Sequence, residues 1–312
     1  MSNCKNILIT GATGFVGRHL LEDIDADNYQ IRLTTRKHQQ KLQKLYPNFE
    51  VVVADLNNLN ELKDAFDGID VVINTAAEVR NEAQLAITNI GGTRNLIEAI
   101  AYHKIKKLIH LSSVGVIGSQ YSASEIIIDE ENKCFPKNEY ERTKLISEEL
   151  IIEAQKQHQF KLDIIRPTNV FGENHPFNAL LGLFKYIKSG RPFIYGSHAK
   201  VNYVYVKDLT YLICYLLKIK DDKGIVNIGQ SVDLEYFYQL VQEILKSKNK
   251  NIVIPEFLTF AFNLIKVKKI ESVTNKVVYS DKKLLEFYNY PYGEFEGLKR
   301  TITHYKHLNL LT

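Results

Sequence analysis

The feature that most constrains the fold is a regular alternation of short β-branched runs with segments of helical spacing over the first half of the chain. Strand, helix and strand at such intervals predict parallel pairing through crossover helices. Most strand candidates are continuous apolar runs, as expected when helices cover both faces of a sheet. The predicted strands are Ile7–Thr10, Ile31–Thr34, Val51–Ala54, Val71–Asn74, Lys107–Ser112 and Leu162–Arg166. The predicted helices are Phe15–Ile24, Leu59–Phe66, Gly92–His103 and Glu141–Gln157.

After Arg166 the regular alternation of strands and helices ends, because prolines and glycines interrupt the chain and the expected elements become mixed. The sequence therefore predicts an α/β fold, with a doubly wound parallel sheet in residues 1–172. Residues 173–312 are expected to form mainly a small mixed substrate lobe, some of whose elements could return to the sheet. The expected helices there are Ala179–Ser189, Asp208–Lys218 and Asp233–Ser247. The expected strands are Pro192–Tyr195, Asn202–Val206 and Ile225–Ile228.

Composition narrows the classes of partner. The chain has 312 residues, 45% of them hydrophobic, which is enough to bury a sizeable core. Its 40 Lys and Arg residues against 36 acidic ones give a net charge of +4. The basic residues are scattered, so we expect an ordinary surface and no nucleic-acid partner.

The cysteines and the apolar stretches bear on the cellular location of the protein. Cys4, Cys134 and Cys214 show no CxxC spacing, which indicates a reducing compartment and no zinc or other metal site. The longest apolar stretch, Ile252–Val267, is too interrupted to span a bilayer. No secretory signal precedes the first strand, so we expect a cytoplasmic protein without an integral membrane segment. The segment 256–278 gives no clear pattern; it could shape the substrate lobe, or a membrane-facing or partner surface.

A glycine-rich turn, Gly11-Ala-Thr-Gly14-Phe-Val-Gly17, follows the first strand and opens the first helix. A dinucleotide pyrophosphate needs close backbone approach and a helix N-terminus directed at it. The spacing GxxGxxG differs from GxGxxG, and a lone glycine pattern also fits an ordinary strand-to-helix turn. In this context we predict a phosphate turn, with Gly17 letting the helix pack on the sheet. Residues 1–172 are therefore predicted to form an NAD(P)-binding Rossmann domain. Its predicted cofactor contacts are Gly11, Thr13, Gly14, Phe15, Val16 and Gly17.

The end of the second strand bears on the choice of cofactor. It reads Leu33-Thr34-Thr35-Arg36-Lys37, without the acidic residue that would bind a ribose 2′-hydroxyl. Arg36 can make a bidentate, charge-assisted contact with a 2′-phosphate. This favours NADP(H) over NAD(H), the alternative being that Arg36 and Lys37 are solvated loop charges.

Tyr140, Lys144 and Ser113 form the candidate catalytic group. Tyr140 and Lys144 stand four residues apart at the start of a helix, so they share one face. The pKa of free tyrosine is about 10, and a neighbouring ammonium and a nicotinamide cation would lower it. Lys144 would also hold the nicotinamide ribose, and Ser113 would hydrogen-bond the reacting oxygen. Tyr140 and Lys144 alone would also fit an exposed pair on a helix, and Ser113 alone would fit a polar residue that caps a loop. The three residues in this order are much stronger evidence for a catalytic group.

These motifs, in this order, resemble the extended short-chain dehydrogenase/reductase family, in its NAD-dependent epimerase/dehydratase group. The resemblance covers essentially the whole chain. Further stretches that carry it are Asp55-Leu56, Asn74-Thr-Ala-Ala77, Asn89-Ile-Gly-Gly-Thr93, Ser112-Ser113-Val-Gly-Val-Ile-Gly118, Arg166-Pro167-Thr-Asn169-Val-Phe-Gly172, Tyr205-Val-Lys-Asp208 and Asn227-Ile-Gly229. It implies Asp55 near the adenine, Ala76 along the dinucleotide groove and Asn169 near a substrate diphosphate. The other implied cofactor contacts are Leu56, Ala77, Asn89 and Pro167.

Structural alternatives stand beside four of these assignments. Asp55 could cap the following helix, and Asp208 could be the N-cap of the helix after it. Asn89 could tie strand connections together, and Asn169 could hold the loop after the sixth strand.

Three functions compete: a nucleotide-sugar epimerase or 4-ketosugar reductase, a reductase of a hydrophobic ketone (hydroxysteroid or dihydroflavonol-like), and a non-catalytic NADP-binding regulator. The third is weakest, because the tyrosine, lysine and serine are all present. Family dehydratases carry Thr-Asp-Glu where this chain reads Ser113-Val114-Gly115, which favours simple hydride transfer. The family arginine shortly before Tyr203 is absent and Val201 stands there, so the diphosphate half of the site is unassigned. We predict a small-molecule substrate, a nucleotide-sugar, while a homodimer through 92–103 and 141–157 is what the resemblance implies.

Overall fold

The computed structural model describes residues 5–37, 39–118, 121–122, 124–178, 180–255 and 273–311. The chain divides into two compact units. The first unit comprises Met1–Gly118, Lys133–Arg166 and Thr210–Val226, and the second comprises Ser119–Asn132, Pro167–Leu209 and Asn227–Thr312. The predicted division at residue 172, with substrate binding in the later part, stays a prediction.

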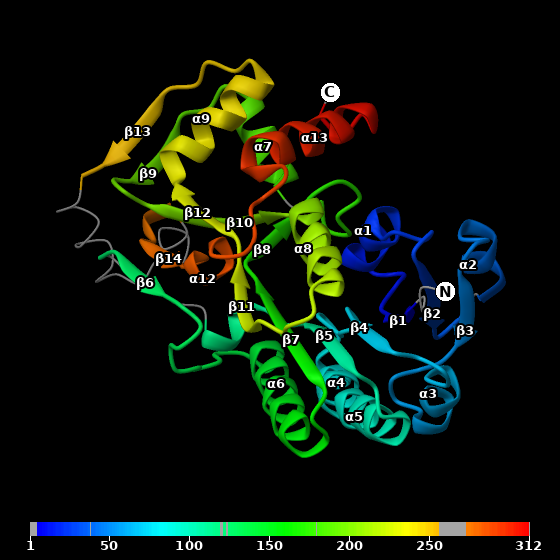
Figure 1. The fold of residues 1–312 in the computed structure, drawn as a ribbon. Helices are drawn as coiled ribbons and strands as arrows, with labels where there is room; N and C mark the ends of the chain where they lie inside the picture. Colours follow the sequence, from blue (N-terminus) through cyan, green and yellow to red (C-terminus); the bar gives the residue numbers. More distant parts are fainter. Residues whose placement is uncertain are drawn as a thin grey trace. The chain divides into compact units, whose positions relative to one another are not determined.

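A seven-stranded sheet forms the centre of the first unit, in the order β11-β7-β5-β4-β1-β2-β3 (Figure 1). All pairings from β3 to β7 are parallel, and the strand order reverses between β1 and β4. This confirms the predicted doubly wound fold, and a late strand, β11, does join the sheet. The strands are β1 (Lys5–Thr10), β2 (Tyr29–Thr35), β3 (Glu50–Val53), β4 (Val71–Asn74), β5 (Lys107–Leu111), β7 (Lys161–Pro167) and β11 (Gly224–Ile228).

The crossover segments between these strands are mostly helical, and the four helices predicted there begin and end within two residues of the expected positions. The helices are α1 (Phe15–Asp23), α2 (Gln39–Leu45), α3 (Leu59–Ala65), α4 (Glu82–Leu85), α5 (Gly92–His103), α6 (Glu139–His158) and α8 (Val206–Lys218). A π-helical turn, η1 (Ala86–Gly91), joins α4 to α5, and a short 3-10 turn, η2 (Val114–Ile117), follows β5.

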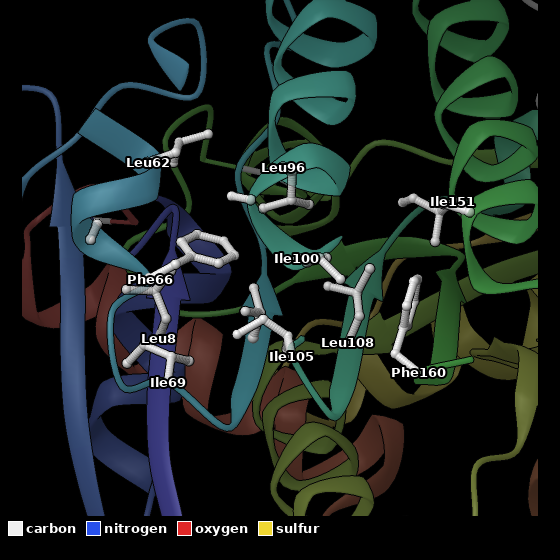
Figure 2. Packing of buried hydrophobic residues seen from close by; sticks show 14 of the residues in the cluster. Leu8, Leu62, Phe66, Ile69, Leu96, Ile100, Ile105, Leu108, Ile151 and Phe160 are labelled. Atoms are coloured by element: carbon white, nitrogen blue, oxygen red, sulfur yellow. The ribbon is translucent and has the colours of Figure 1, made fainter. Parts of the chain in front are cut away.

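One hydrophobic cluster joins the sheet to α3, α5 and α6 (Figure 2). Leu62, Leu96 and Ile151 enter it from these three helices, and Leu8 and Leu108 enter it from β1 and β5. All five side chains are fully buried. Because α6 carries the candidate tyrosine and lysine, this cluster fixes their helix against the sheet.

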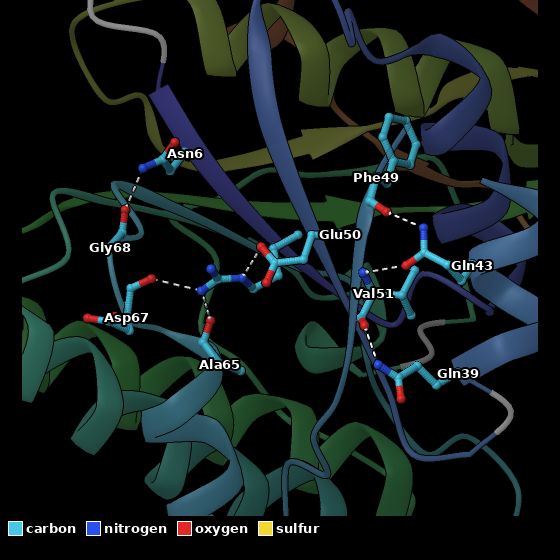
Figure 3. Close-up of polar contacts among 10 residues, drawn as sticks. Asn6, Gln39, Gln43, Phe49, Glu50, Val51, Ala65, Asp67 and Gly68 are labelled. Carbon is cyan, nitrogen blue, oxygen red and sulfur yellow. Dashed lines mark hydrogen bonds and ion pairs between the residues drawn. The ribbon is translucent and has the colours of Figure 1, made fainter. Parts of the chain in front are cut away.

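The outer edge of the sheet is β3, and side chains of α2 cover its backbone (Figure 3). Gln39 Nε2 donates to Val51 O at 2.6 Å, and Val51 N donates to Gln43 Oε1 at 3.2 Å. Gln43 Nε2 also donates to Phe49 O at 2.8 Å. Unpaired edge backbone is a template for unwanted strand addition, and here two glutamine amides occupy it. They also hold α2 beside the first residues of β3.

The second unit contains three small sheets: β12-β10-β8, β13-β9 and β14-β6. β10 pairs antiparallel with β12, while the other three pairings are parallel. The strands are β6 (Ile126–Ile128), β8 (Asn169–Phe171), β9 (Phe193–Gly196), β10 (Lys200–Tyr205), β12 (Gln230–Asp233), β13 (Asn251–Ile254) and β14 (Val277–Tyr279). The helices are α7 (Leu181–Lys188), α9 (Leu234–Leu245), α12 (Lys282–Leu285) and α13 (Gly293–His307).

Two expectations concern membranes and the unassigned segment 256–278. Within the part of the chain that the structure describes, no helix is both long and apolar enough to cross a bilayer. Of the segment 256–278, residues 256–272 lie outside the described residues, as does most of the apolar stretch Ile252–Val267.

Candidate active site

The glycine turn after β1 is folded so tightly that side chains do not fit. Gly11 has φ +74°, and a Cβ there would lie 2.5 Å from the backbone nitrogen of Ala76, which follows β4. A Cβ on Gly17 would lie 2.2 Å from Gly11 O, directly after β1, so Gly17 lets the start of α1 lie close against the end of that strand. Gly14 is the N-cap of α1 without a capping side chain, and no acid stands in the first turn. The turn therefore fits the close approach of an anionic phosphate to a helix N-terminus.

A cavity of about 200 Å³, here called the switch-point cavity, opens where the strand order reverses. The structure brings eight of the predicted cofactor residues together in its lining: Gly11, Thr13, Gly14, Arg36, Asp55, Leu56, Ala76 and Ala77. The other predicted cofactor residues do not line it: Phe15, Val16, Gly17, Asn89, Tyr140, Lys144 and Pro167. The sequence assigned no role to Glu78 or to the other lining threonines, which lie at strand ends, in the loop after β4 or in η1: Thr10, Thr34, Thr35, Thr75 and Thr88.

A second cavity, of about 750 Å³ and here called the basic pocket, shares part of this lining. Among the described residues that line it, four are cations, Arg18, Arg36, Lys37 and Lys41, and one is an acid, Asp55. Arg36 lines both cavities, whereas Lys41, on α2, lines only the basic pocket. Such an excess of positive charge favours an anionic group at this end of the switch-point cavity.

Asp55 and Asn89, for each of which the sequence allows a structural role beside a cofactor contact, make hydrogen bonds within the first unit. Asp55 Oδ1 accepts the amide of Asn57 at 2.9 Å, whereas the side chain of Asn58 caps α3. Asn89 is 4% exposed, its Oδ1 accepts Glu78 N at 2.8 Å, and its Nδ2 donates to Glu78 O and to Thr143 Oγ1. Asn89 thus ties the loop after β4 to α6.

Asn169 and Asp208, for which the sequence also allows a structural role, make hydrogen bonds within the second unit. Asn169 Nδ2 donates to Asn202 O at 3.1 Å, which helps to hold β8 beside β10. Asp208 lies in the first turn of α8, and its carboxylate accepts the amides of Tyr292 and Gly293 at 2.8 and 3.0 Å. It therefore caps the start of α13, whereas we had expected it to cap the helix that follows it in sequence.

Tyr140 and Lys144 lie in the first two turns of α6, whose N-terminus is capped by Asn138. Lys144 is 2% exposed, and its Nζ donates to Leu111 O at 2.7 Å. Burial lowers the pKa of Lys144 to about 8. Burial also raises the pKa of Tyr140 to about 12, and Glu141 adds to the effect. The lowering that we expected for the pKa of tyrosine thus stays a prediction for the site with bound nicotinamide.

Ser113 lies two residues after the end of β5 and is the N-cap of η2. Its Oγ accepts the amide of Gly115 at 3.0 Å, which leaves the hydroxyl hydrogen for another acceptor. Ser113 is partly exposed, whereas Ser112 is buried. Since Leu111 is the last residue of β5, its bond to Lys144 places the lysine at the strand end that carries Ser113.

The doubly wound sheet, the glycine turn at its switch point and the lysine held at the end of β5 define an enzyme of the dinucleotide-binding class. The family described as the NAD dependent epimerase/dehydratase family matches residues 7–229. The chain belongs to this family, and it is an NAD(P)-dependent enzyme of the extended short-chain dehydrogenase/reductase type.

Individual relatives agree with this assignment. The chain is 32% identical over 257 residues to an N-acetyl-alpha-D-glucosaminyl-diphospho-ditrans,octacis-undecaprenol 4-epimerase of Escherichia coli O157:H7, covering 79% of this chain and 73% of the relative. The UDP-glucose 4-epimerase of Thermotoga maritima, solved with UDP-glucose, has a TM-score of 0.75 at 22% identity, covering 97% of this chain and 99% of that one. The UDP-glucuronic acid 4-epimerase of Bacillus cereus, solved with NAD, has a TM-score of 0.74 at 21% identity, covering 97% and 99%. At these identities the two structures support the fold.

Proposed function

We propose that the protein is a 4-epimerase of a hexose carried on a diphosphate. The observation that carries the proposal is the bond from Lys144 Nζ to Leu111 O, which joins the Tyr140 helix to the strand end bearing Ser113. Tyrosine, lysine and serine at one strand end suit proton exchange with a hydroxyl on a carbinol carbon. The bound nicotinamide supplies the hydride acceptor and donor.

Each residue of this group has a proposed role. Tyr140 exchanges a proton with the hydroxyl oxygen of the substrate, and Ser113 donates a hydrogen bond to that oxygen. Lys144 holds the nicotinamide ribose and favours the phenolate form of Tyr140 once the site is loaded. The residues after Ser113 are Val114 and Gly115, so this loop carries no acidic pair to move protons for water elimination. We therefore favour epimerisation over dehydration as the reaction of this protein.

The carrier of the sugar is the second part of the proposal. The name of the Escherichia coli relative specifies a sugar on a polyprenyl diphosphate, whereas the names of the two structural neighbours specify UDP-sugars. In this chain Val201 stands in β10 where the family arginine is expected, and it pairs with Val232 of β12. A valine there offers no charge to a diphosphate, which nucleotide and polyprenyl carriers both contain, so the polyprenyl carrier is proposed from the likeness to the Escherichia coli relative. A nucleotide-sugar remains the alternative.

The cofactor that we propose is NADP(H), because the basic pocket adjoins the switch-point cavity through Arg36. The same observation favours a second candidate function, reduction of a 4-keto sugar by NADPH. An epimerase returns the hydride within each turnover, whereas a reductase has to exchange its dinucleotide every cycle. A cytoplasmic location and a homodimer through α5 and α6 complete the proposal, and light scattering on the purified protein tests the dimer.

One set of incubations tests the function. Purified protein is mixed with UDP-glucose, UDP-N-acetylglucosamine or undecaprenyl-diphospho-N-acetylglucosamine, with NAD⁺ or NADP⁺, and the configuration at C4 is followed by NMR. An epimerase gives a mixture of C4 epimers without net change in the dinucleotide. A parallel incubation of a 4-keto nucleotide-sugar with NADPH tests the reductase. Consumption of NADPH there, and no epimer from any substrate, would favour this second function. Dinucleotide binding without either reaction would contradict both candidates, and the Tyr140→Phe variant serves as the inactive control.

A further inference from the structure

A chain of buried polar side chains runs through the core of the first unit to Lys144. Thr10 Oγ1 donates to Asn74 Oδ1 at 2.6 Å, and Asn74 Nδ2 lies 3.0 Å from His110 Nδ1. The other ring nitrogen, His110 Nε2, lies 3.3 Å from Lys144 Nζ. These residues come from β1, β4, β5 and α6, and each is at most 2% exposed. No sequence motif assigns a role to His110, although a histidine within an apolar buried strand is unusual.

The neighbours of Asn74 determine which ring nitrogen of His110 carries the proton. The backbone amide of Ala76 donates to Asn74 Oδ1 at 3.2 Å. Turning the side-chain amide would place its NH₂ group against that N–H, so the oxygen has to stay where it is. Asn74 Nδ2 therefore faces His110 Nδ1 and donates to it. Since Nδ1 accepts, the neutral ring carries its hydrogen on Nε2.

The hydrogen on Nε2 points toward Lys144 Nζ. An ammonium group has only donors, whereas a neutral amine offers one lone pair. The His110 N–H thus finds an acceptor only when Lys144 is unprotonated, and it opposes an ammonium in a site shielded from water. One N–H of the amine is used by Leu111 O, so a single N–H remains for a ligand or for Tyr140.

The surroundings of Lys144 and His110 include effects that lower the pKa of these residues and effects that raise it. Burial, followed by the charge of Lys144, lowers the pKa of His110 well below its usual range, which keeps the ring neutral. Glu148, one turn further along α6, raises the pKa of Lys144, but burial has the larger effect. Glu148 is itself paired with the buried Arg166 of β7 at 2.6 Å. Tyr140 lies one turn before Lys144 and stays protonated near neutral pH.

We propose that His110, held by Asn74 and Thr10, is a positioning residue that fixes the side chain of Lys144 and favours its neutral amine in the protein without dinucleotide. The proposal rests on the proposed function insofar as Lys144 serves Tyr140 and the nicotinamide ribose. His110 itself lines neither the switch-point cavity nor the basic pocket. It acts through the orientation and protonation of the lysine.

NMR on the whole protein, labelled with ¹⁵N at histidine, tests the proposal without any assay of activity. Two-bond ¹H–¹⁵N correlations report which ring nitrogen carries the proton, and the signal of His110 is assigned by its loss in the His110→Gln variant. We expect the Nε2–H tautomer, with shifts that respond as Lys144 titrates, and no such response in Lys144→Met. A proton on Nδ1, or a charged ring at neutral pH, would overturn the proposal. An absence of epimerisation would leave this result intact and contradict only the proposed function.

Paired variants test the consequence for the lysine. His110→Leu removes the N–H, whereas His110→Gln offers an oxygen to Asn74 and an N–H to Lys144. Dinucleotide affinity is measured from about pH 6 to pH 10, with thermal unfolding as the control for folding. We expect the pH midpoint that belongs to Lys144 to rise by about one unit in His110→Leu, the size of one buried hydrogen bond, and to stay close to wild type in His110→Gln. A purely structural role would weaken binding by the same factor at every pH and leave the midpoint in place, which would overturn the proposal.

Discussion

Replacing Arg36 with serine should remove much of the preference for NADPH over NADH. Arg36 lines both the switch-point cavity and the basic pocket, so it is the cation best placed to reach a phosphate on the adenosine ribose. Its side chain is exposed, and Arg18, Lys37 and Lys41 share the pocket, so the loss of one cation is partly compensated. NADH carries no 2′-phosphate, and its affinity should change little.

The expected magnitude follows from this exposure. A hydrogen bond to a charged group contributes about 1.5–3 kcal/mol when it is well formed, and solvent screening at an exposed site reduces the value. We therefore expect a loss on the order of 1.4 kcal/mol, which corresponds to about a tenfold rise in Kd for NADPH. Higher ionic strength should weaken NADPH binding in the wild type more than in Arg36→Ser.

Nicotinamide fluorescence titrations with both dinucleotides, at low and high salt, measure these affinities. Lys44→Ser is the matched control, because Lys44 is an exposed cation of α2 that lines neither cavity. Tighter binding of NADH than of NADPH by the wild type would refute the assignment of the basic pocket. An equal loss of both affinities in Arg36→Ser would refute the specific role of Arg36.

Four further outcomes follow from the geometry. Tyr140→Phe should lower kcat by about 10²–10⁴ in the epimerase assay while the Kd for dinucleotide stays nearly unchanged. Gly11→Ala should lower the free energy of unfolding in urea by more than Gly68→Ala, because both glycines have positive φ but only a Cβ on Gly11 would meet backbone atoms. Glu148→Gln should cost about 3–5 kcal/mol in the same experiment, since it leaves a buried guanidinium without its carboxylate. Because the folded-state pKa of Lys144 is about 8, below the usual 10.5, the folded protein releases this proton first, so stability should rise as the pH increases above 8, and Lys144→Met should lack this rise.

The parts of the fold that sequence could predict are those with a strong apolar rhythm. The predicted bounds of β4 and α5 agree with the structure at both ends. The helix α2 was not predicted, because its sequence QQKLQKL buries only Leu42 and is held by its glutamine amides. The helix α13 was also missed, since glycines and β-branched residues interrupt its pattern and its cap, Asp208, is distant in the sequence. Such tertiary bonds leave no local signal.

The candidate site also has a part that the sequence predicts and a part that only the structure shows. The glycine turn and the loops after β3 and β4 were found from motifs, and they meet in one cavity because parallel strands end at one edge of the sheet. The link between Lys144 and the end of β5 could not be read from the sequence, because it is a bond to a backbone carbonyl. His110 carried a weak signal, a polar residue inside a buried strand, but its meaning depends on the orientation of Asn74, which only the structure shows.

The glutamine cover of β3 has a consequence for hydrogen exchange. Amides on the open side of an edge strand usually exchange with solvent rapidly, whereas that of Val51 is bonded to a side chain of α2. Its exchange rate therefore measures how often α2 lifts from the sheet, and α2 contributes Lys41, Leu42 and Leu45 to the wall of the basic pocket. A ligand that docks in this pocket should slow the exchange of the Val51 amide in β3, which is bonded to Gln43 of the same helix. That single amide makes the opening of the pocket wall observable without any change to the protein.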